Sequence, residues 1–342
     1  MWWVFLSSCA RVPAICTGTS PSERVVDRFW SVLDENYAVF PQRLPAGTTW
    51  DEVGRAACAS VTPMADDPAV FSALLTMARV LDDGHIQIEG PGGLEGDGWE
   101  TVWPHDGSVR EAIGVARTSL DRGFSRAGDG AFRWGRRGDV GYLVVTRSDE
   151  LGGSGGEGSD LRRAEDALDR VFDDLEGTRG LVVDVRFHDG GWDAVGLTTA
   201  ASFVGPAAVA WTSAQRTGPE PTDLGEPYVT RIPATDEGYA GEVVVLTSGG
   251  TFSAGETFVL AMRTRDRVTT LGEPTSGHLS DLYETGLGRG FRTTWSGDLY
   301  ADGEGRIHEA MGIPPDREVP FDAAGVASGT DDMLEQAFGR LR

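Results

Sequence analysis

A serine stands at the start of a predicted helix, directly after a buried strand and a glycine turn. Residues 243–247 read as a buried strand with four apolar residues and a terminal threonine, two glycines follow Ser248, and Ser253 precedes a second apolar run. A helix N-terminus offers unpaired N–H groups, here that of Ala254, and the positive end of the dipole, which stabilise negative charge beside a serine oxygen. The pattern predicts a nucleophile or, because Ser253 and Glu256 match S-x-x-E, a plain capping box.

A second strand ends in a double glycine. Residues 181–185 have the apolar pattern of a buried strand, and Gly190 with Gly191 precedes the helix expected from about residue 192. Such a turn leaves backbone N–H groups directed at the cleft beyond the strand ends. With the Ala254 amide, the Gly190 or Gly191 amide could form an oxyanion hole. The alternative is an ordinary strand-to-helix turn in which glycine supplies the dihedral angles.

The base for such a serine would be a histidine, because all 30 basic residues are arginine and the chain contains no lysine. This excludes a Schiff base, a pyridoxal-phosphate anchor, a Walker-A loop and a Ser–Lys dyad. Of the five histidines, His85 follows a predicted helix and begins a short strand. An imidazole that titrates near neutrality can take the serine proton, although a solvated or capping histidine is the alternative. Glu309, just before a Gly/Pro turn, could orient a histidine or be a surface charge.

Other chemistries fit the sequence less well. Histidine stands next to an acidic residue at His105, His188 and His308, but no H-x-x-x-H spacing exists, which disfavours a metal hydrolase. An α/β-hydrolase is disfavoured because G-x-S-x-G is missing and the candidate histidine precedes the serine. The 342 residues carry 53 acidic against 30 basic side chains, a net charge of −23. Such a surface repels phosphate backbones, so nucleic acid is not an expected partner.

The chain is long enough for two compact domains or for one large domain with a subdomain. An apolar stripe from Val25 to Tyr37 and the helix start at Asp67-Pro68 predict a small helical subdomain over residues 21–89. Residues 90–138 are glycine-rich and are expected to form loops and short strands. From residue 139 to 342, strands alternate with helices, which predicts βαβ units and a mostly parallel α/β sheet. The strands are expected near 140–146, 181–185, 209–212, 243–247 and 268–271, and the helices over 161–175, 192–203 and from 253.

The first twenty residues suggest targeting. Leu6-Ser7-Ser8-Cys9 fits the small-residue pattern before a lipidated cysteine, so residues 1–20 are a signal or lipoprotein segment, with a disordered N-terminus as the alternative. Lipidation of Cys9 implies the cell envelope, where Cys16 and Cys58 could pair, whereas a cytoplasmic location is the alternative. No later stretch holds the ~20 apolar residues of a membrane span, so membrane contact is expected only through Cys9. The oligomeric state stays open.

Taken together, these segments resemble the tail-specific (C-terminal processing) serine peptidases. The likeness is to the histidine-type branch, which holds the tricorn protease core and the interphotoreceptor retinoid-binding protein repeats. The segments that carry it span nearly the whole chain after residue 21 and come in the family's order. They are Phe29-Trp30 to Asn36-Tyr37, Trp50-Asp51, Asp83-Gly84-His85, Asp184-Val185-Arg186 with Gly190-Gly191, Thr251 to Glu256, Gly272 to Gly277, and Glu309 to Asp316.

The resemblance implies a serine endopeptidase acting on peptides or unfolded proteins without a cofactor. It implies a ClpP/crotonase-like core, and the roughly 45 residues from Gly90 to Trp134 are too few for the PDZ module of many relatives. The implied roles are Ser253 as the acylated nucleophile, His85 as the general base, Glu309 as its acidic support, and the amides of Gly190 or Gly191 with Ala254 as oxyanion donors.

Two positions depart from the family pattern. Gly84 stands where the tricorn-like tetrad has a serine that links the histidine to the glutamate. His188 stands where the family usually has asparagine. Both departures count toward the alternative function, a catalytically inactive protein that binds a ligand or peptide on the same scaffold.

Overall fold

The structure is a computed structural model that describes residues 14–99, 106–153 and 155–342, and the chain divides into two compact units. Both units are discontinuous in sequence. The first unit comprises Met1–Thr101, Ala214–Glu226 and Ser280–Leu299. The second unit comprises Val102–Ser213, Pro227–Leu279 and Tyr300–Arg342.

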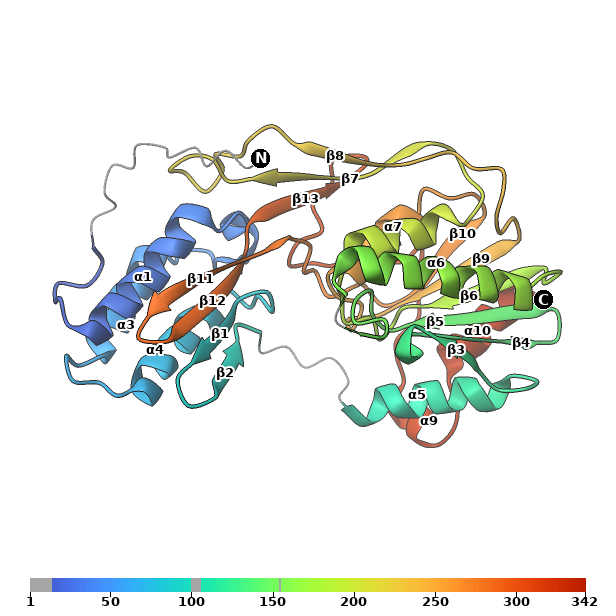
Figure 1. Ribbon diagram of the computed structural model, residues 1–342, viewed down its shortest axis with the longest axis horizontal. Coiled ribbons are helices and arrows are strands. Elements are labelled where there is room, and N and C mark those ends of the chain that lie inside the picture. Colours follow the sequence, from blue (N-terminus) through green and yellow to red (C-terminus); the bar gives the residue numbers. More distant parts are fainter. Residues whose placement is uncertain (1–13, 100–105, 154) are drawn as a thin grey trace. The chain divides into compact units, whose positions relative to one another are not determined.

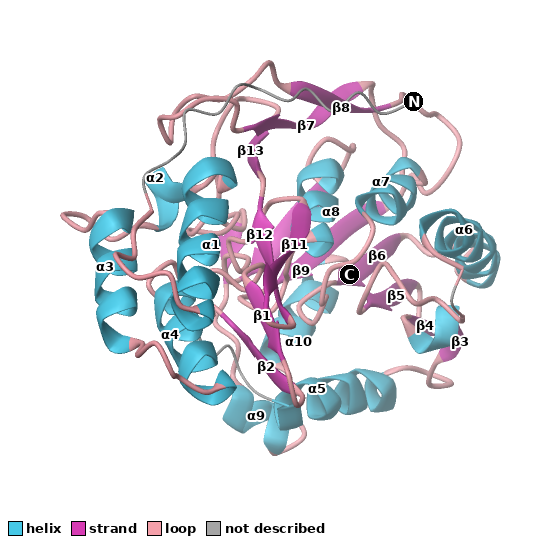
Figure 2. Ribbon diagram, turned by 60° about the vertical axis from the view of Figure 1, so that its left-hand side comes forward, coloured by secondary structure: helices cyan, strands magenta, loops and turns pink. Residues whose placement is uncertain are grey.

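The helices of the first unit are drawn in cyan in Figure 2. Three of those described begin at a residue whose side chain caps the helix, whereas the short helix Phe40–Arg43 has no such cap. Ser20 and Thr49 each form a capping box with the glutamate three residues later, and the Asp66 carboxylate accepts a hydrogen bond from the Ala69 N–H. The predicted apolar stripe is buried, as the complete burial of Phe29 shows. The helices in the described part of this unit are α1 (Pro21–Asn36), α2 (Phe40–Arg43), α3 (Trp50–Ser60) and α4 (Asp67–Arg79).

An antiparallel sheet completes the first unit, with the strand order β11-β12-β1-β2. Its second half comes from residues 280–299, which the sequence pattern groups with residues 139–342. Ile88 of β1 lies opposite Thr293 of β12, so a distant segment runs beside the strand that follows His85. The strands are β1 (Gln87–Gly90), β2 (Leu94–Asp97), β11 (Leu282–Gly288) and β12 (Phe291–Ser296).

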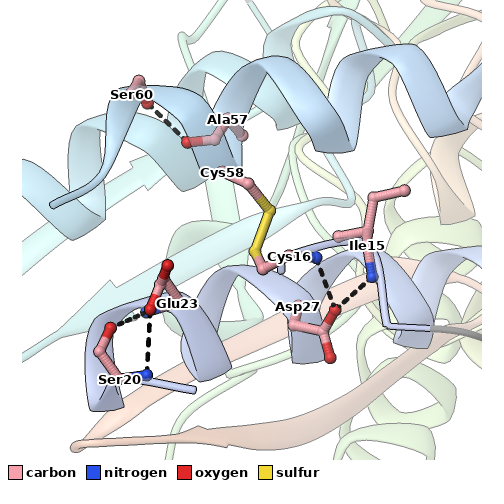
Figure 3. The surroundings of a disulfide bond; sticks show 8 residues. All are labelled: Ile15, Cys16, Ser20, Glu23, Asp27, Ala57, Cys58 and Ser60. Atoms are coloured by element: carbon pink, nitrogen blue, oxygen red, sulfur yellow. Dashed lines mark hydrogen bonds between the residues drawn. A yellow bond between two sulfur atoms is a disulfide. The ribbon is translucent and has the colours of Figure 1, made fainter. Parts of the chain in front are cut away.

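A disulfide joins Cys16 to Cys58 and ties the segment before α1 to α3 (Figure 3). The same segment is held by the Asp27 carboxylate, which accepts hydrogen bonds from the N–H groups of Ile15 and Cys16. Cys9, the predicted lipidation site, lies outside the described residues. Within the described ranges, no helix is both long and apolar enough to cross a membrane.

The second unit is built on a seven-stranded sheet of order β14-β10-β9-β6-β5-β4-β3 (Figure 1). The strands from β14 to β5 are parallel, and β4 and β3 continue the sheet antiparallel. A smaller sheet has the order β13-β7-β8. The strands are β3 (Ser125–Ala127), β4 (Phe132–Arg137), β5 (Val140–Val145), β6 (Gly180–Asp184), β7 (Ala208–Gln215), β8 (Tyr228–Ile232), β9 (Glu242–Thr247), β10 (Val268–Gly272), β13 (Asp298–Asp302) and β14 (Arg317–Glu318).

Apolar side chains cover both faces of the seven-stranded sheet. Val183 and Val245 point into the core shared with α6, α7 and α8, whereas their neighbours Val182 and Val244 pack with α10. Burial on both faces explains the unbroken apolar runs in the sequence of these strands. The helices of the second unit are α5 (Asp106–Ser119), α6 (Glu157–Asp174), α7 (Asp193–Ala201), α8 (Ala254–Met262), α9 (Ala323–Ala327) and α10 (Asp332–Arg340), with a 3₁₀ turn at Gly128–Gly130.

Helix α5 differs from the loops and short strands expected over residues 90–138. Its buried face includes Ala112 and Ala116, which are fully inaccessible. The stripe also holds Val109 and Ile113, which recur with the alanines at spacings of three and four. The glycine-rich composition of residues 90–138 outweighed this periodicity in the prediction. The same segment does contain the short strands β2, β3 and β4.

Candidate active site

Ser253 forms the turn between β9 and α8 with the unusual backbone angles φ 53° and ψ −118°. A residue other than glycine in such a conformation is strained by about 1–3 kcal/mol, and strain of this kind concentrates at functional sites. Ser253 is the N-cap of α8, and the next N–H, that of Ala254, has no acceptor among the residues that the structure describes. The serine side chain and an unsatisfied donor therefore share one helix end.

Glu256 does more than cap this helix. Its buried carboxylate accepts from the Ser253 N–H at 3.3 Å, the reciprocal bond of a capping box. Four further donors come from one loop: the hydroxyls of Thr275 (2.6 Å) and Ser276 (2.9 Å) and the N–H groups of Gly277 (2.8 Å) and His278 (2.7 Å). Burial raises the pKa of Glu256, and these hydrogen bonds oppose that shift. The carboxylate thus fixes the 275–278 loop against the start of α8.

The turns after β6 and β9 are bonded to each other. The Ser248 hydroxyl donates to the Arg186 carbonyl at 2.6 Å, and the Phe252 N–H donates to the His188 carbonyl at 2.9 Å. A Cβ atom placed on Gly190 would lie 3.0 Å from the Ser253 Cβ and 3.5 Å from its Oγ. The double-glycine turn and the serine predicted from sequence are therefore direct neighbours.

His188 sets the conformation of the double-glycine turn. Its Nδ1 accepts a hydrogen bond from the Gly190 N–H at 3.1 Å, and its Nε2 lies 3.1 Å from the Ser148 hydroxyl. Because Nδ1 is an acceptor, the ring proton is on Nε2, which donates to Ser148. Burial lowers the pKa of His188 to about 4, so the ring is neutral at physiological pH. The Gly190 amide is thereby engaged, whereas the described residues hold no acceptor for the Gly191 N–H.

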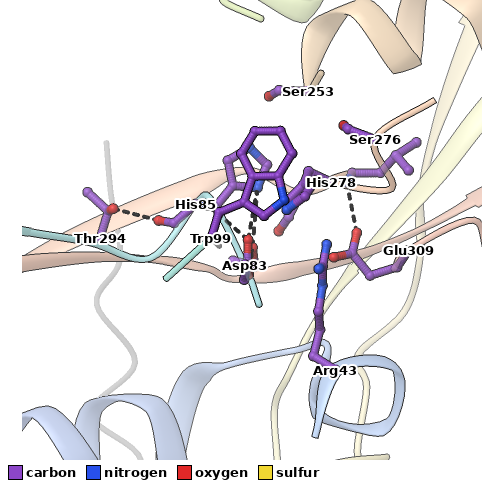
Figure 4. Close-up of polar contacts among 12 residues, drawn as sticks. Arg43, Asp83, His85, Trp99, Ser253, Ser276, His278, Thr294 and Glu309 are labelled. Carbon is purple, nitrogen blue, oxygen red and sulfur yellow. Dashed lines mark hydrogen bonds and ion pairs between the residues drawn. The ribbon is translucent and has the colours of Figure 1, made fainter. Parts of the chain in front are cut away.

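Glu309 also contacts the segment that begins with the 275–278 loop, but it follows this loop in the sequence, whereas Glu256 precedes it. Its buried carboxylate accepts from the Leu279 N–H at 2.8 Å (Figure 4), and the next residue, Ala310, donates to the Gly277 carbonyl at 2.8 Å. The Nε2 atom of His308 lies 3.0 Å from the Asp302 carboxylate, within hydrogen-bond distance. Throughout residues 14–99, 106–153 and 155–342, no three potential ligands gather as a metal site requires.

His85 belongs to the first unit, where it precedes β1 and is buried. Its Nδ1 lies 3.3 Å from the Ser296 hydroxyl and 3.9 Å from Oδ1 of Asp83. Its backbone is held on both sides, since its N–H donates to Asp83 at 2.9 Å and its carbonyl accepts from the Thr294 hydroxyl at 2.6 Å (Figure 4). Burial lowers the pKa of His85, the Asp83 charge opposes that shift, and the Arg43 charge adds to it. A neutral, oriented imidazole results.

The family is decided by a match over residues 139–319, a range with segments in both units. The sequence profile of peptidase family S41 matches residues 139–319, which is more than half of the chain. The chain belongs to peptidase family S41. This is the tail-specific family that the motifs resemble. The matched range contains Gly190, Gly191, Ser253, Ala254 and Glu309.

Several solved structures superpose on this chain over most of their length. A candidate peptidase from Parabacteroides merdae superposes with a TM-score of 0.79 at 23% identity, over 94% of this chain and 97% of that one. Mature CPAF in complex with lactacystin gives 0.65 at 11% identity, over 94% and 98%. The photosystem II D1 C-terminal processing protease gives 0.52 at 15% identity, over 92% and 98%. These likenesses establish a mixed α/β S41 fold with a helical N-terminal region.

The residues predicted for the S41 site fall in both units. Ser253, Ala254 and the two glycines are neighbours in the second unit, which also holds Glu309. His85 lies in the first unit. Ser296 carries no signal in the sequence, because it lies in a strand that no motif marks. Asp83 carried a signal, because it stands two residues before His85, where an aspartate side chain reaches the histidine N–H.

Proposed function

We propose that this S41 family member is a serine endopeptidase that cleaves peptide bonds through an acyl-enzyme on Ser253. The observation that carries the proposal is the strained Ser253 turn at the N-terminus of α8, in contact distance of the Gly190 position. A strained strand-to-helix turn exposes a nucleophilic oxygen where helix N–H groups can stabilise the developing charge. A plain capping box needs neither the strain nor the glycine neighbour.

In the proposed reaction, the Ser253 oxygen attacks the carbonyl carbon of the scissile bond while His85 takes the serine proton. The carbonyl oxygen becomes an oxyanion, which the N–H groups of Ala254 and Gly191 stabilise. We assign the second donor to Gly191 because the Gly190 N–H already donates to His188. The imidazolium gives its proton to the leaving amine. His85 then takes a proton from water as the water oxygen attacks the ester, and it returns that proton to the Ser253 oxygen as the acid product leaves. Glu309 is the proposed acidic support of the imidazolium charge.

The proposal includes the architecture that the motifs imply. The seven-stranded sheet with its helices is the proposed crotonase-like core, and the short segment before β4 is proposed to replace the PDZ module of many relatives. The substrates are then peptides or unfolded proteins that enter without capture of a tail by such a module. The reaction as written uses no cofactor, and its oxyanion donors are all backbone amides.

We further propose that the protein acts outside the cytoplasm. The disulfide between Cys16 and Cys58 supports an oxidising compartment. Anchoring would follow from lipidation of Cys9, the site suggested by Leu6-Ser7-Ser8-Cys9. Expression of the full chain in a bacterial host tests this: the wild type is expected in the membrane fraction and Cys9→Ser in the soluble fraction. Equal distribution of the two proteins would contradict the anchor.

Hydrolysis of fluorescently labelled casein tests the proposed activity. Ser253→Ala and His85→Ala are each expected to lower kcat by about 10³-fold or more, because they remove the nucleophile and its base. Ser202→Ala is the matched control, since the Ser202 hydroxyl donates to the Thr198 carbonyl at the end of α7. A wild type that cleaves no faster than Ser253→Ala between about pH 6 and 9 would contradict the proposal.

A further inference from the structure

We propose that Asp83 and Ser296 are positioning residues for His85, and that they hold its imidazole in the Nδ1–H tautomer and stabilise its positive charge. The inference rests on the proposed function, because it gives the general base its orientation. All three side chains belong to the first unit, and none is more than 1% exposed. Neither Asp83 nor Ser296 has a role assigned from the sequence.

Counting protons fixes the direction of each hydrogen bond. The Ser296 hydroxyl donates to Oδ2 of Asp83 at 2.7 Å, which uses its single proton. At its 3.3 Å contact with Nδ1 of His85, the same hydroxyl oxygen is therefore the acceptor. The Nδ1 atom then carries the proton of the neutral ring, and Nε2 keeps the lone pair that a general base requires.

The hydrogen bonds to Asp83 stabilise an ionised carboxylate in the protein interior. Its Oδ2 accepts from the Tyr37 hydroxyl at 2.8 Å as well as from Ser296, and its Oδ1 accepts from the His85 N–H at 2.9 Å. Three donors offset the desolvation that burial imposes on an ionised carboxylate. This carboxylate lies 3.9 Å from Nδ1, close enough to favour the imidazolium that forms when Nε2 takes a proton.

The sheet explains why the hydroxyl comes from a distant residue. Gly84, beside His85, has no side chain, and β12 runs antiparallel to β1. The Thr294 hydroxyl of β12 donates to the His85 carbonyl. The hydroxyl of Ser296, two residues further on the same strand, contacts Nδ1 of the imidazole. One strand thus holds the backbone and the imidazole of the same histidine.

The proton inventory of the proposed step is simple. Nε2 receives the proton of the attacking serine, and the imidazolium Nδ1–H stays bonded to the Ser296 oxygen. The Ser296 proton stays directed at Asp83, so no proton passes to the carboxylate. When Nε2 releases its proton to the leaving amine, the neutral tautomer is restored without rearrangement of the pair.

Steady-state kinetics of the full chain measure the roles of the pair. Asp83→Asn is expected to lower kcat by about 10²- to 10⁴-fold with KM within about threefold, and Ser296→Ala by about tenfold or more. Ser22→Ala is the matched control, because Ser22 is equally buried in this unit but donates to the Ala65 carbonyl and accepts from Arg289, away from His85. Its kcat is expected to stay within about twofold of the wild type, as most substitutions away from the chemistry do.

Two further measurements distinguish the proposed role of Asp83 from loss of folding and from support of His85 by Glu309. Thermal unfolding identifies variants that lose activity only because they lose structure, and the comparison is made among variants with similar midpoints. Glu309→Gln tests the other candidate acid. If Glu309→Gln abolishes turnover while Asp83→Asn stays within about threefold of the wild type, the proposal is overturned.

Nitrogen chemical shifts of the imidazoles give a readout that does not need catalysis. His85, assigned by comparison with His85→Gln, is expected as the Nδ1–H tautomer with a pKa below its usual 6.5. Asp83→Asn is expected to lower that pKa further, because it removes the charge that favours the imidazolium. An Nε2–H tautomer, or an unchanged pKa in Asp83→Asn, overturns the inference. A wild type without peptidase activity overturns the proposed function instead, whatever the shifts show.

Discussion

Gly190 and Ser253 approach so closely that a Cβ atom on the glycine would lie 3.0 Å from the Cβ of the serine. Residues 63 apart in sequence are neighbours because two parallel strands end at the same edge and their turns are bonded to each other. Contacts this short are rarely tolerated, so the turn after β6 requires glycine at this position for space as well as for its φ of 103°.

Gly190→Ala is therefore expected to displace the serine and to lower kcat/KM by about 10²-fold, since a small misplacement of reacting groups is costly. Gly138→Ala is the matched control, because Gly138 also has a positive φ, 62°, but nothing lies within 4 Å of its Cβ position. Both variants incur backbone strain of about 1–3 kcal/mol, which urea denaturation would register. Equal kcat/KM values for the two variants would argue against a site at this contact.

The bond from the Gly190 N–H to His188 Nδ1 predicts which substitutions the turn accepts. An asparagine oxygen can accept from an N–H two residues later, as the imidazole does here, whereas leucine cannot. His188→Asn is expected to keep kcat/KM within about threefold, and His188→Leu to lower it about tenfold or more. Peptidase assays of both variants check this. A fully active His188→Leu would show that the turn holds its shape without an acceptor.

His188 also predicts how stability depends on pH. Its pKa is about 4 in the folded protein and 6.5 as the ordinary value, so the unfolded chain binds the proton first. The stability of the neutral ring is complete above pH 6.5 and is lost as the pH falls toward 4, by about 3 kcal/mol in total. Urea unfolding at pH 7 and 4.5 is expected to show a larger drop for the wild type than for His188→Asn. Identical drops would mean that the ring is not held neutral.

The disulfide predicts a redox-dependent stability of the first unit. Cys16 and Cys58 close a separation of 42 residues, for which loop-entropy arguments give about 4 kcal/mol. Reduction is expected to lower the unfolding midpoint on the order of 10 °C. Calorimetry with and without a phosphine reductant measures this, and Cys58→Ser should show the low midpoint in both conditions. The prediction would be contradicted if the unfolding midpoint of the wild type stayed the same after the disulfide had been shown to be reduced.

The sequence predicts those helices and strands whose burial produces a periodic pattern of apolar residues. The apolar stripe beginning at Val25 marks α1, and the run 243–247 marks β9, because burial on one helix stripe or on both strand faces leaves a clear period. Helix α5 carries the same kind of period at Val109, Ala112 and Ile113, but it lies in a glycine-rich stretch whose composition is typical of loops. Family S41 follows from short motifs whose order the chain preserves.

The surroundings of His85 depend on contacts between distant residues, which local sequence patterns do not predict. Ser296 is 213 residues from Asp83, and only the pairing of β12 with β1 brings the two together. The sequence singles out Gly84 as a departure that removes a linking hydroxyl. The structure places another hydroxyl, from Ser296, 3.3 Å from Nδ1 of His85. A contact that depends on strand pairing leaves no trace in spacing, charge or periodicity.

The most direct test of the account is the site of covalent modification by a fluorophosphonate probe. Intact mass and peptide mapping of the wild type at about pH 7.5 should show a single adduct on Ser253, because only an activated serine reacts rapidly. His85→Ala should react at least about 10²-fold more slowly, and Ser253→Ala should carry no adduct. An unmodified Ser253, or one that reacts at the same rate in His85→Ala, would contradict the claim that these two residues form a nucleophile and its base.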